Sequence, residues 1–296
     1  MISFRSHLVS LIAVFLALAV GVVLGGGPLS EVGRADPGGA DRAAAREDDA
    51  AAAYSDDFAT QVAPKLLAGQ LTGETVVLMT MPGADAKAVR GAADLVKTAG
   101  GAPVGEYDVQ PALVDPTEKS LVDTLGSQLL TTLKDVDIPA EAPTYERMGR
   151  LIGLGVATPT PAGAAVDANG TSVMESVKGA DLMTTKSTTR RGALILVVLG
   201  DEPDRNAGVD VIVAGLVTGL RAASQGIVAA GSTDSGANGL LSLLRDNADA
   251  QAAASLTDSV QTSAGQVTAV LALAGTKNGT IGSFGASGSD GAVPLG

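Results

Sequence analysis

An apolar run near the start of the chain limits the fold and the location of the residues that follow it. Residues 8–24 are apolar except for Ser10 and Gly21, and no later stretch is comparable. As a helix, this run would span about 25 Å at 1.5 Å per residue. That length is close to the ~30 Å hydrocarbon core of a bilayer. The sequence therefore predicts one membrane segment over 8–24, inside an anchor at 1–27, and a body carried on one side of the membrane.

A cleaved signal peptide is the alternative to a permanent anchor. Residues 17–19 (Ala-Leu-Ala) match the small-residue pattern that precedes signal cleavage. Five more residues, mostly apolar, follow them before the helix-breaking run 25–28 (Gly-Gly-Gly-Pro), which favours an uncleaved anchor. Arg5 and the amino terminus precede the apolar run. The positive-inside rule then predicts a single-pass protein with an extracytoplasmic C-terminal body.

Composition narrows the classes of fold and partner. The chain is 46% hydrophobic but only 2% aromatic, so Ala, Val, Leu and Ile must build its core. Such a core suits helices packed on Val- and Ile-rich strands. The net charge of −12 argues against a nucleic-acid partner, because phosphate binding needs a basic surface. With no cysteine, the chain has no disulfides, thiolate metal sites or cysteine nucleophiles.

Short buried strands alternate with amphipathic helices from residue 61 onward. Alternation of this kind predicts an α/β fold with Rossmann-like, mostly parallel sheet or sheets in two halves. Strands are expected at 75–80, 103–107, 193–199, 226–230 and 253–257, and helices at 85–98, from 115 onward, 145–157, 209–223, 240–246 and 263–274.

The chain also divides into segments of different composition. The segment before the body is acidic and alanine-rich, which indicates a helical stalk or linker; the absence of a sustained heptad gives a coiled coil little support. A stretch rich in Thr, Gly and Pro between the halves is expected to be an insertion with one helix at 172–181. The Gly- and Ser-rich end is expected to be flexible. The expected segments are an anchor (1–27), a stalk (28–60), a first α/β half (61–157), an insertion (158–191), a second α/β half (192–275) and a tail (276–296).

Acidic residues follow two of the expected strands. Ligands of open α/β sheets lie beyond the carboxyl ends of strands. Asp201, Glu202 and Asp204 follow the strand at 193–199; their carboxylates suit a hard cation and would repel phosphate. An acidic turn that caps the next helix is the simpler interpretation. Asp258 follows the last expected strand, and a loop residue or helix cap is again the simpler interpretation.

Few residues of this sequence are candidates for metal binding or catalysis. Met79 and Met81 would share one face of a strand, where thioethers can bind copper(I), although core packing is the commoner role of such a pair. His7 is the only histidine and lies beside the apolar run, so no Ser–His–Asp or Cys–His set can form. We therefore predict no catalytic, cofactor-binding or metal residues, no cofactor and no enzymatic activity.

Four stretches of the sequence carry a family resemblance: 1–29, 63–83, 193–201 and 258–274. They resemble the copper transporter MctB family of actinobacterial envelope proteins. The resemblance implies a role in copper homeostasis or export, and a location in the cell envelope, with the outer membrane as one option. The family supplies no metal-ligand set that maps onto numbered positions. The stalk is shorter and looser than the more regular coiled coil of family members, which argues against dimerisation through the stalk. A homo-oligomer is still an open alternative.

Relatives also suggest a second role for the family, as a membrane-tethered partner in complexes that control peptidoglycan hydrolysis and cell separation. A single apolar span cannot enclose a pore alone, so transport would require oligomerised anchors. A non-enzymatic envelope scaffold that binds a partner protein agrees better with the residues themselves. The copper role rests on the resemblance.

Overall fold

The structure, a computed structural model, describes residues 37–188, 190–200 and 208–295. The chain divides into two compact units, Met1–Ser55 and Asp56–Gly296. The expected anchor at 8–24 and the acidic turn at 201–204 both lie outside the described residues. Within the described ranges, no helix combines the length and apolar character needed to cross a membrane.

The first described element is helix α3 (Pro37–Leu67), so the expected stalk is helical over its described part. Its final turns belong to the second unit, where Ala63 and Leu67 are buried. There the Asp56 carboxylate accepts a 2.7 Å hydrogen bond from the backbone N–H of Ser263, at the start of a later helix. A carboxylate in this position is stabilised by the positive end of the helix dipole.

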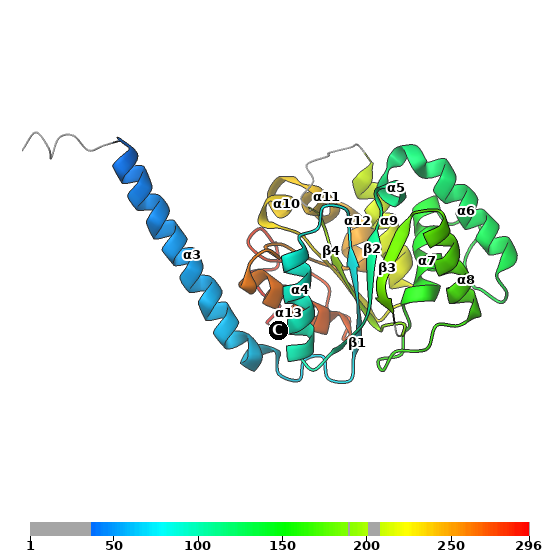
Figure 1. The fold of residues 1–296 in the computed structure, drawn as a ribbon, viewed down its shortest axis with the longest axis horizontal. Coiled ribbons are helices and arrows are strands. Elements are labelled where there is room, and N and C mark those ends of the chain that lie inside the picture. Colours follow the sequence, from blue (N-terminus) through cyan, green and yellow to red (C-terminus); the bar gives the residue numbers. More distant parts are fainter. Residues whose placement is uncertain (1–36, 189, 201–207, 296) are drawn as a thin grey trace, which may run out of the picture. The chain divides into compact units, whose positions relative to one another are not determined.

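The second unit is built around one mixed, mostly parallel sheet (Figure 1). Its order is β3-β2-β1-β4-β5-β6-β7, so strands from both expected halves share a single sheet. Only β3 runs antiparallel to its neighbour, β2. The prediction of an α/β fold with a mostly parallel sheet is therefore confirmed. The strands are β1 (Thr75–Thr80), β2 (Ala102–Val109), β3 (Met183–Thr188), β4 (Leu194–Val198), β5 (Gly226–Ala230), β6 (Ser255–Thr257) and β7 (Ser283–Phe284).

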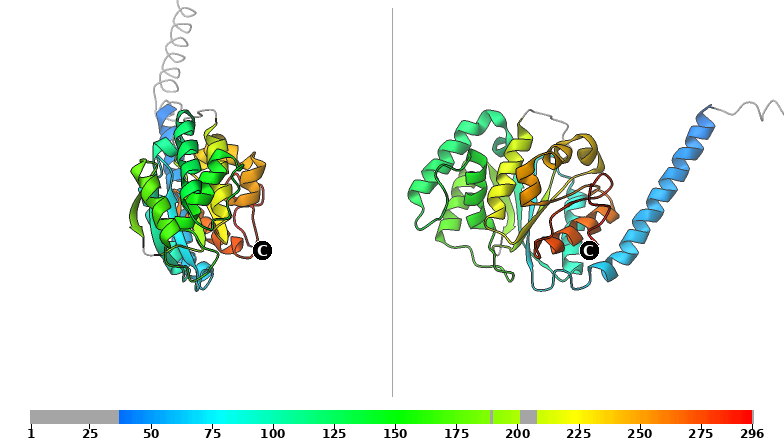
Figure 2. Two further views of the ribbon diagram at one scale, coloured as in Figure 1. Left: turned by 90° about the vertical axis from the view of Figure 1, so that its right-hand side faces the viewer. Right: turned by 180° about the vertical axis from the view of Figure 1, so that it is seen from behind.

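Helices cover both faces of this sheet, as the views in Figures 1 and 2 show. On one face lie α4 (Ala86–Thr98) and α13 (Ser263–Thr276). The other face is covered by α6 (Lys119–Thr132), α7 (Thr144–Val156), α8 (Ala168–Gly179), α9 (Val209–Arg221), α11 (Leu240–Arg245) and α12 (Ala248–Ala253). Shorter elements are α5 (Pro111–Val114), the 3₁₀ turn η1 (Pro116–Glu118) and α10 (Thr233–Asn238).

The central strand β4 is apolar throughout because both of its faces are covered. In β4, Leu194, Leu196 and Val198 belong to the core under α4 and α13. Ile195 and Val197 point to the opposite side and join the core under α7 and α9. Every β4 side chain is buried. A strand buried on both faces needs an unbroken apolar run rather than alternation, which explains the strength of its sequence signal.

Local capping residues fix the helix starts that the sequence predicted. Asp85 accepts a hydrogen bond from the Lys87 backbone N–H and caps α4. Asp115 accepts one from the Thr117 backbone N–H, at 2.8 Å, although the turn it starts is 3₁₀ before α6 continues it. A capping side chain satisfies a helix N–H group that has no partner within the helix.

Three segments differ from the sequence prediction. The expected insertion contains β3, which the sequence analysis missed because this edge strand is polar, and its helix α8 begins at Ala168 rather than at 172. The expected flexible tail contains β7, which pairs with β6 through Leu256–Ser283 and Thr257–Phe284. Residues 248–253, adjoining the expected strand at 253–257, form α12 instead, which shortens that strand to β6.

Candidate functional site

Asp258 is the most enclosed acidic side chain among the described residues. It follows β6 directly, and none of its surface is exposed. Oδ1 accepts hydrogen bonds from the Ser259 hydroxyl at 2.7 Å and the Ala286 backbone N–H at 2.6 Å. Oδ2 accepts from the Ser287 hydroxyl at 2.6 Å and the Ser287 backbone N–H at 2.9 Å. A buried carboxylate with this many donors stays ionised.

The balance of burial and hydrogen bonding sets the protonation of Asp258. Burial alone would raise its pKa, since a charged carboxylate loses hydration. The Ser287 and Ser259 hydroxyls and the Ser287 and Ala286 backbone N–H groups outweigh that effect, and the pKa lies below its ordinary value. The carboxylate therefore fixes the segment after β7 to the end of β6.

Arg245 completes this network from α11. Its Nη2 donates to Asp258 Oδ2 at 3.1 Å and to the Phe284 carbonyl at 2.9 Å. Nη1 donates to the Ser287 hydroxyl at 2.7 Å. The arginine side chain is 12% exposed, so this ion pair is largely withdrawn from water. The pair ties three segments that are distant in sequence: α11, the end of β6 and the C-terminal segment.

A glycine lets the main chain approach the carboxylate. Gly285 has φ +113°, and a Cβ there would lie 2.3 Å from Asp258 Oδ1. Only glycine combines that conformation with that approach at low cost. The expected role of Asp258 as a loop residue is correct, but it caps no helix: Thr262 caps α13 instead. Its role in the structure is to hold the C-terminal segment.

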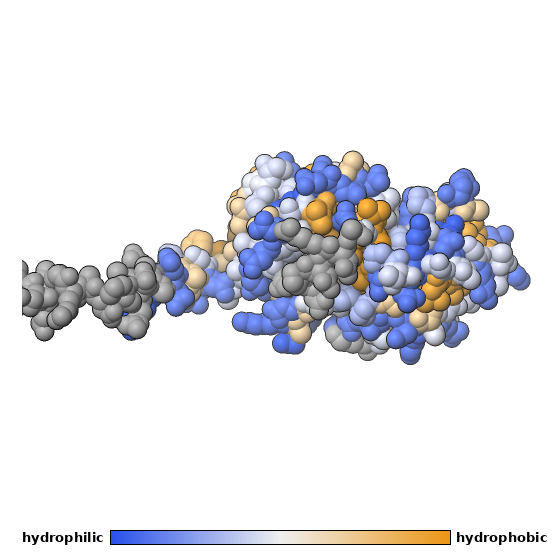
Figure 3. Space-filling model, turned by 90° about the horizontal axis from the view of Figure 1, so that it is seen from above, coloured by the Kyte–Doolittle hydropathy of each residue, from blue (hydrophilic) through white to orange (hydrophobic). Residues whose placement is uncertain are grey.

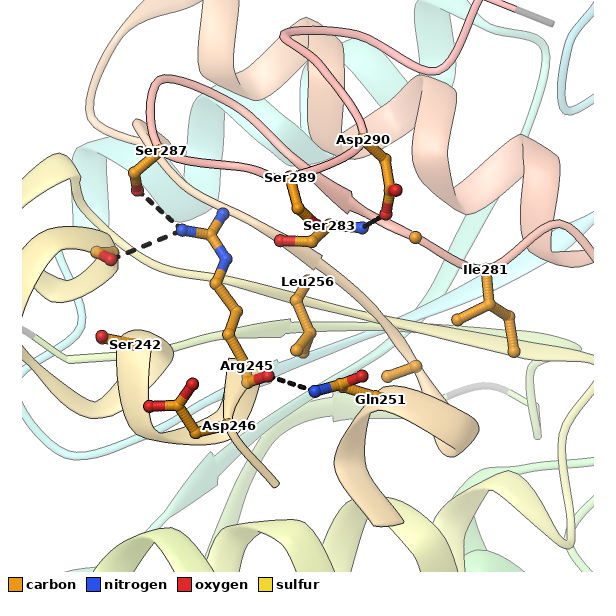
Figure 4. Close-up of a pocket in the computed structure, with 13 residues that line it drawn as sticks. Ser242, Arg245, Asp246, Gln251, Leu256, Ile281, Ser283, Ser287, Ser289 and Asp290 are labelled. Carbon is orange, nitrogen blue, oxygen red and sulfur yellow. Dashed lines mark hydrogen bonds between the residues drawn. The ribbon is translucent and has the colours of Figure 1, made fainter. Parts of the chain in front are cut away.

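Beside this network lies a cleft of about 440 Å³ (Figure 4). Its two walls come from α11–α12 and from the C-terminal segment, with Leu256 of β6 between them. Most of its lining is polar. The polar lining residues are Ser242, Arg245, Asp246, Gln251, Ser283, Ser287, Ser289 and Asp290.

Many open α/β sheets bind ligands in a crevice at the switch point of the strand order. In this sheet the order reverses between β1 and β4. At this point Gly200 packs against the turn after β1, and a Cβ on Gly200 would lie 1.8 Å from the Pro82 carbonyl oxygen. The acidic residues Asp201, Glu202 and Asp204 follow, outside the described residues.

The methionine pair lies in the core, which confirms the simpler interpretation. Met79 is 2% exposed and Met81 is 5% exposed, and both belong to the core on the α7–α9 face. Met79 lies beside Tyr107 and Val197 in the neighbouring strands. Among the described residues there is no group of three or more His, Cys, Asp or Glu side chains that could hold a metal ion.

Sequence reasoning singled out Asp258 but missed its partners. Arg245 and Ser287 are separated from it by 13 and 29 residues, and nothing local marks them. The composition of the run 285–288 (Gly-Ala-Ser-Gly) predicts a flexible segment instead. The only hint was that a Gly–Ser run can form a tight loop around a buried acceptor as easily as it can remain disordered.

The fold and site together define a mixed α/β protein with a mostly parallel sheet, a buried carboxylate network and a polar cleft. A family model described as "Copper transport outer membrane protein, MctB" matches residues 1–295. The chain belongs to this family.

Curated relatives cover nearly the whole chain. The protein named copper transporter MctB of Mycobacterium tuberculosis strain H37Rv is 31% identical over 307 residues, covering 94% of each chain. The protein of the same name from Mycobacterium leprae is 30% identical over 308 residues, covering 92% of each. The description of the family as outer membrane proteins indicates a location in the cell envelope.

Proposed function

We propose that this protein takes part in copper transport or homeostasis in the cell envelope. The observation that carries the proposal is the family match over residues 1–295. In addition, the chain matches relatives named copper transporter MctB over more than nine-tenths of their length. In the proposed topology, residues 8–24 form an uncleaved single-pass anchor, and the α/β body is extracytoplasmic.

The described residues favour an indirect role for the body. Copper(I) prefers thioether and thiolate ligands. The chain has no cysteine, and Met79 and Met81 are enclosed in the core. We expect no high-affinity copper site in the body and no enzymatic activity. Copper movement would then depend on assembled anchors or on a partner protein.

Copper accumulation tests the proposal directly. Deleting the gene should raise copper retained by the cell, and the full-length protein should restore the original level. The variant Met79→Leu should restore it equally, because Leu fills a similar volume without a sulfur ligand. Unchanged copper retention after deletion would refute a role in copper homeostasis. Submicromolar copper(I) binding by the full-length protein, abolished in Met79→Leu, would instead establish a direct site.

A second candidate function is a non-enzymatic scaffold for a protein that controls peptidoglycan hydrolysis and cell separation. Hydrophilic residues cover most of the face seen in Figure 3, with hydrophobic patches between them. On α3, Phe58 is 56% exposed and Leu66 is 41% exposed. A partner protein that covered these two side chains would remove their apolar surface from water. A mostly parallel sheet with helices on both faces is compatible with such a binding body.

Crosslinked pulldown from envelope membranes separates the two functions. Recovery of cell-wall or division proteins by the full-length protein, reduced by Phe58→Ser, supports the scaffold. Copper flux across proteoliposomes that contain only the pure protein would refute the scaffold as the sole function. The Phe58→Ser variant leaves the half-buried Val62 of the same helix unchanged.

A further inference from the structure

A second cleft, of about 360 Å³, lies near the amino end of β4. Its walls come from the loop before α7, the last turns of α7, residues 157–159 and residues 222–223 after α9. Because β4, β5 and β6 are parallel, this cleft and Asp258, which follows β6, lie at opposite ends of the strands. Its volume falls in the small-molecule range of roughly 300–1,000 Å³.

The walls of this cleft are fixed by contacts within the fold. The Gln225 side-chain N–H donates to the Pro159 carbonyl at 2.7 Å, which holds the segment 157–159 in place. On the other side, α7 approaches the end of α9 closely, since a Cβ on Gly153 would lie 2.7 Å from the Ala223 Cβ. The cleft is therefore formed by the protein itself and needs no ligand to assemble it.

Two arginine side chains line this cleft, Arg150 from α7 and Arg191 from the segment before β4. Arg191 Nη1 donates to the Leu154 carbonyl at 3.2 Å. Leu154 follows Arg150 by four residues, so both lie on the same side of α7. The two arginines therefore reach the cleft along one face of this helix.

Each guanidinium group keeps one terminal nitrogen available. Arg150 uses Nε and Nη2 to donate to Glu146 Oε1, at 3.0 and 2.9 Å, and its Nη1 has no hydrogen-bond partner among the described residues. Arg191 uses Nε for the Ala165 carbonyl and Nη1 for Asp167 and the end of α7. Its Nη2 has no partner in the described part of the chain. Both free nitrogens are open to the cleft rather than sealed in the core.

Nearby carboxylates limit the anions that can enter. Glu146 and Asp167 already pair with the two arginines, and the exposed Asp137 also lines the cleft. Among the ion pairs of the described residues, none joins Asp137 to either arginine. A multiply charged anion would therefore be repelled, whereas a single carboxylate can accept a charge-assisted hydrogen bond from each free nitrogen. The Leu154 carbonyl at the end of α7, which would also repel an anion, is covered by Arg191.

Apolar side chains with surface open to solvent line the rest of this cleft. They are Pro159 and Ala222, which are exposed, and Ile138, Leu154 and Ala223, which are partly exposed. A ligand that covered them would remove their apolar surface from water. Two free guanidinium nitrogens beside an apolar wall match a carboxylate that carries a short hydrocarbon group.

We propose that this cleft binds a small monocarboxylate with a short apolar group. The carboxylate accepts hydrogen bonds from Arg150 Nη1 and Arg191 Nη2, and the apolar group covers Pro159 and Ala222. This site is separate from the proposed copper function and does not depend on it.

Titration of the ¹⁵N-labelled full-length protein with isovalerate tests the site. The backbone amide signals of Leu154, Thr158 and Ala223 should shift together and saturate. Isovaleramide has nearly the same shape but no charge, and should bind at least about tenfold more weakly, the equivalent of one charge-assisted hydrogen bond. Acetate should bind at least about fivefold more weakly, because it covers less apolar surface. Equal affinity for isovalerate and isovaleramide would overturn the proposal, and so would phosphate binding as tight as that of isovalerate.

The variant Arg150→Gln should weaken isovalerate binding by about tenfold or more, because it removes Nη1. The matched control is Arg90→Gln, which removes the same charge from an exposed position on α4, on the opposite face of the sheet, and should leave the affinity within about twofold. Unchanged affinity in Arg150→Gln would overturn the proposal.

The variant Asp137→Asn should raise the affinity for isovalerate about two- to threefold, because it removes a carboxylate that repels the ligand. A gain in affinity cannot come from misfolding, so this variant tests the site even if Arg150→Gln disturbs α7. Weaker binding of isovalerate by Asp137→Asn would overturn the proposal.

Discussion

The centre and the C-terminal edge of the sheet are held together by different forces. At the centre, β4 is buried on both faces by apolar side chains and lies between two further long, buried strands, β1 and β5. At the edge, β6 has three residues and β7 has two, and one carboxylate, Asp258, joins them to α11 and the C-terminal segment. The centre gains stability from apolar area, the edge from a few directed hydrogen bonds.

This difference predicts different responses to mutation. The apolar core should respond to changes in side-chain volume, whichever strand carries them. The edge should respond to charge, because a buried ion that loses its partner leaves the other charge unpaired. The edge should also open locally, since few backbone pairs hold it.

Removing the carboxylate should have the largest effect. In Asp258→Ala, four hydrogen-bond donors lose their acceptor, and Arg245 is left as a partly buried, unpaired charge. We expect a loss of about 3–5 kcal/mol in the free energy of unfolding. Hydrogen exchange should show the loss first at residues 283–290. The control Asp94→Ala, at an acid whose side chain is 72% exposed, should change stability by no more than about 0.5 kcal/mol.

A cavity at the centre of the sheet should lower the free energy of unfolding nearly as much. Its effect should extend over the whole sheet. Leu196→Ala removes a fully buried side chain and should lower the free energy of unfolding by about 2–5 kcal/mol. Denaturant unfolding measures this loss, and hydrogen exchange should rise throughout the sheet rather than at the edge. Leu121→Ala, at a side chain that is 41% exposed, is the control and should have little effect. Selective opening of residues 283–290 in Leu196→Ala would contradict the comparison.

The glycine beside Asp258 should be the next most sensitive position. Gly285→Ala introduces a Cβ against Oδ1 in a backbone conformation with φ +113°, at an expected cost of about 1–3 kcal/mol. Gly291→Ala separates steric contact from backbone strain, because its φ is +103° but no atom lies within 4 Å of the added Cβ. Thermal denaturation of both variants measures the difference. Equal destabilisation would show that strain alone accounts for the effect.

Acid should loosen the edge before the centre. Because the pKa of Asp258 is lowered by folding, its contribution is complete above the ordinary carboxyl pKa of about 3.9 and is lost as pH falls through the folded-state value. Exchange protection of residues 286–287 should fall with pH in that acidic range after correction for intrinsic exchange rates. The same titration of Asp258→Asn should lack this step. Retention of the step in the variant would assign it to another group.

The sequence predicted the centre of the fold well because its signals are local. Thr75–Thr80 and Gly226–Ala230 are strands with the expected bounds. Asp85 and Asp115 start helical segments where capping chemistry places them. Each of these elements is specified by a continuous apolar run or by a cap a few residues away, so neighbouring residues contain the information.

The edges were harder to predict because their partners are distant in sequence. Strand β3 is polar and exists because β2 supplies hydrogen bonds to it. The segment after β7 has the composition of a flexible tail, yet it is ordered by a carboxylate nearly 30 residues earlier in the chain. Asp258 itself was visible as a candidate, but its role required knowledge of Arg245 and Ser287.

By itself, the sequence determined the α/β class, the apolar central strands, the absence of cysteine chemistry and the resemblance to the MctB family. These properties depend on composition and on contacts between near neighbours. The tertiary structure alone decided that both halves share one sheet, that the C-terminal segment closes one edge and that a polar cleft forms there. Those features arise from pairings across long stretches of chain, and such pairings leave little trace in local sequence patterns.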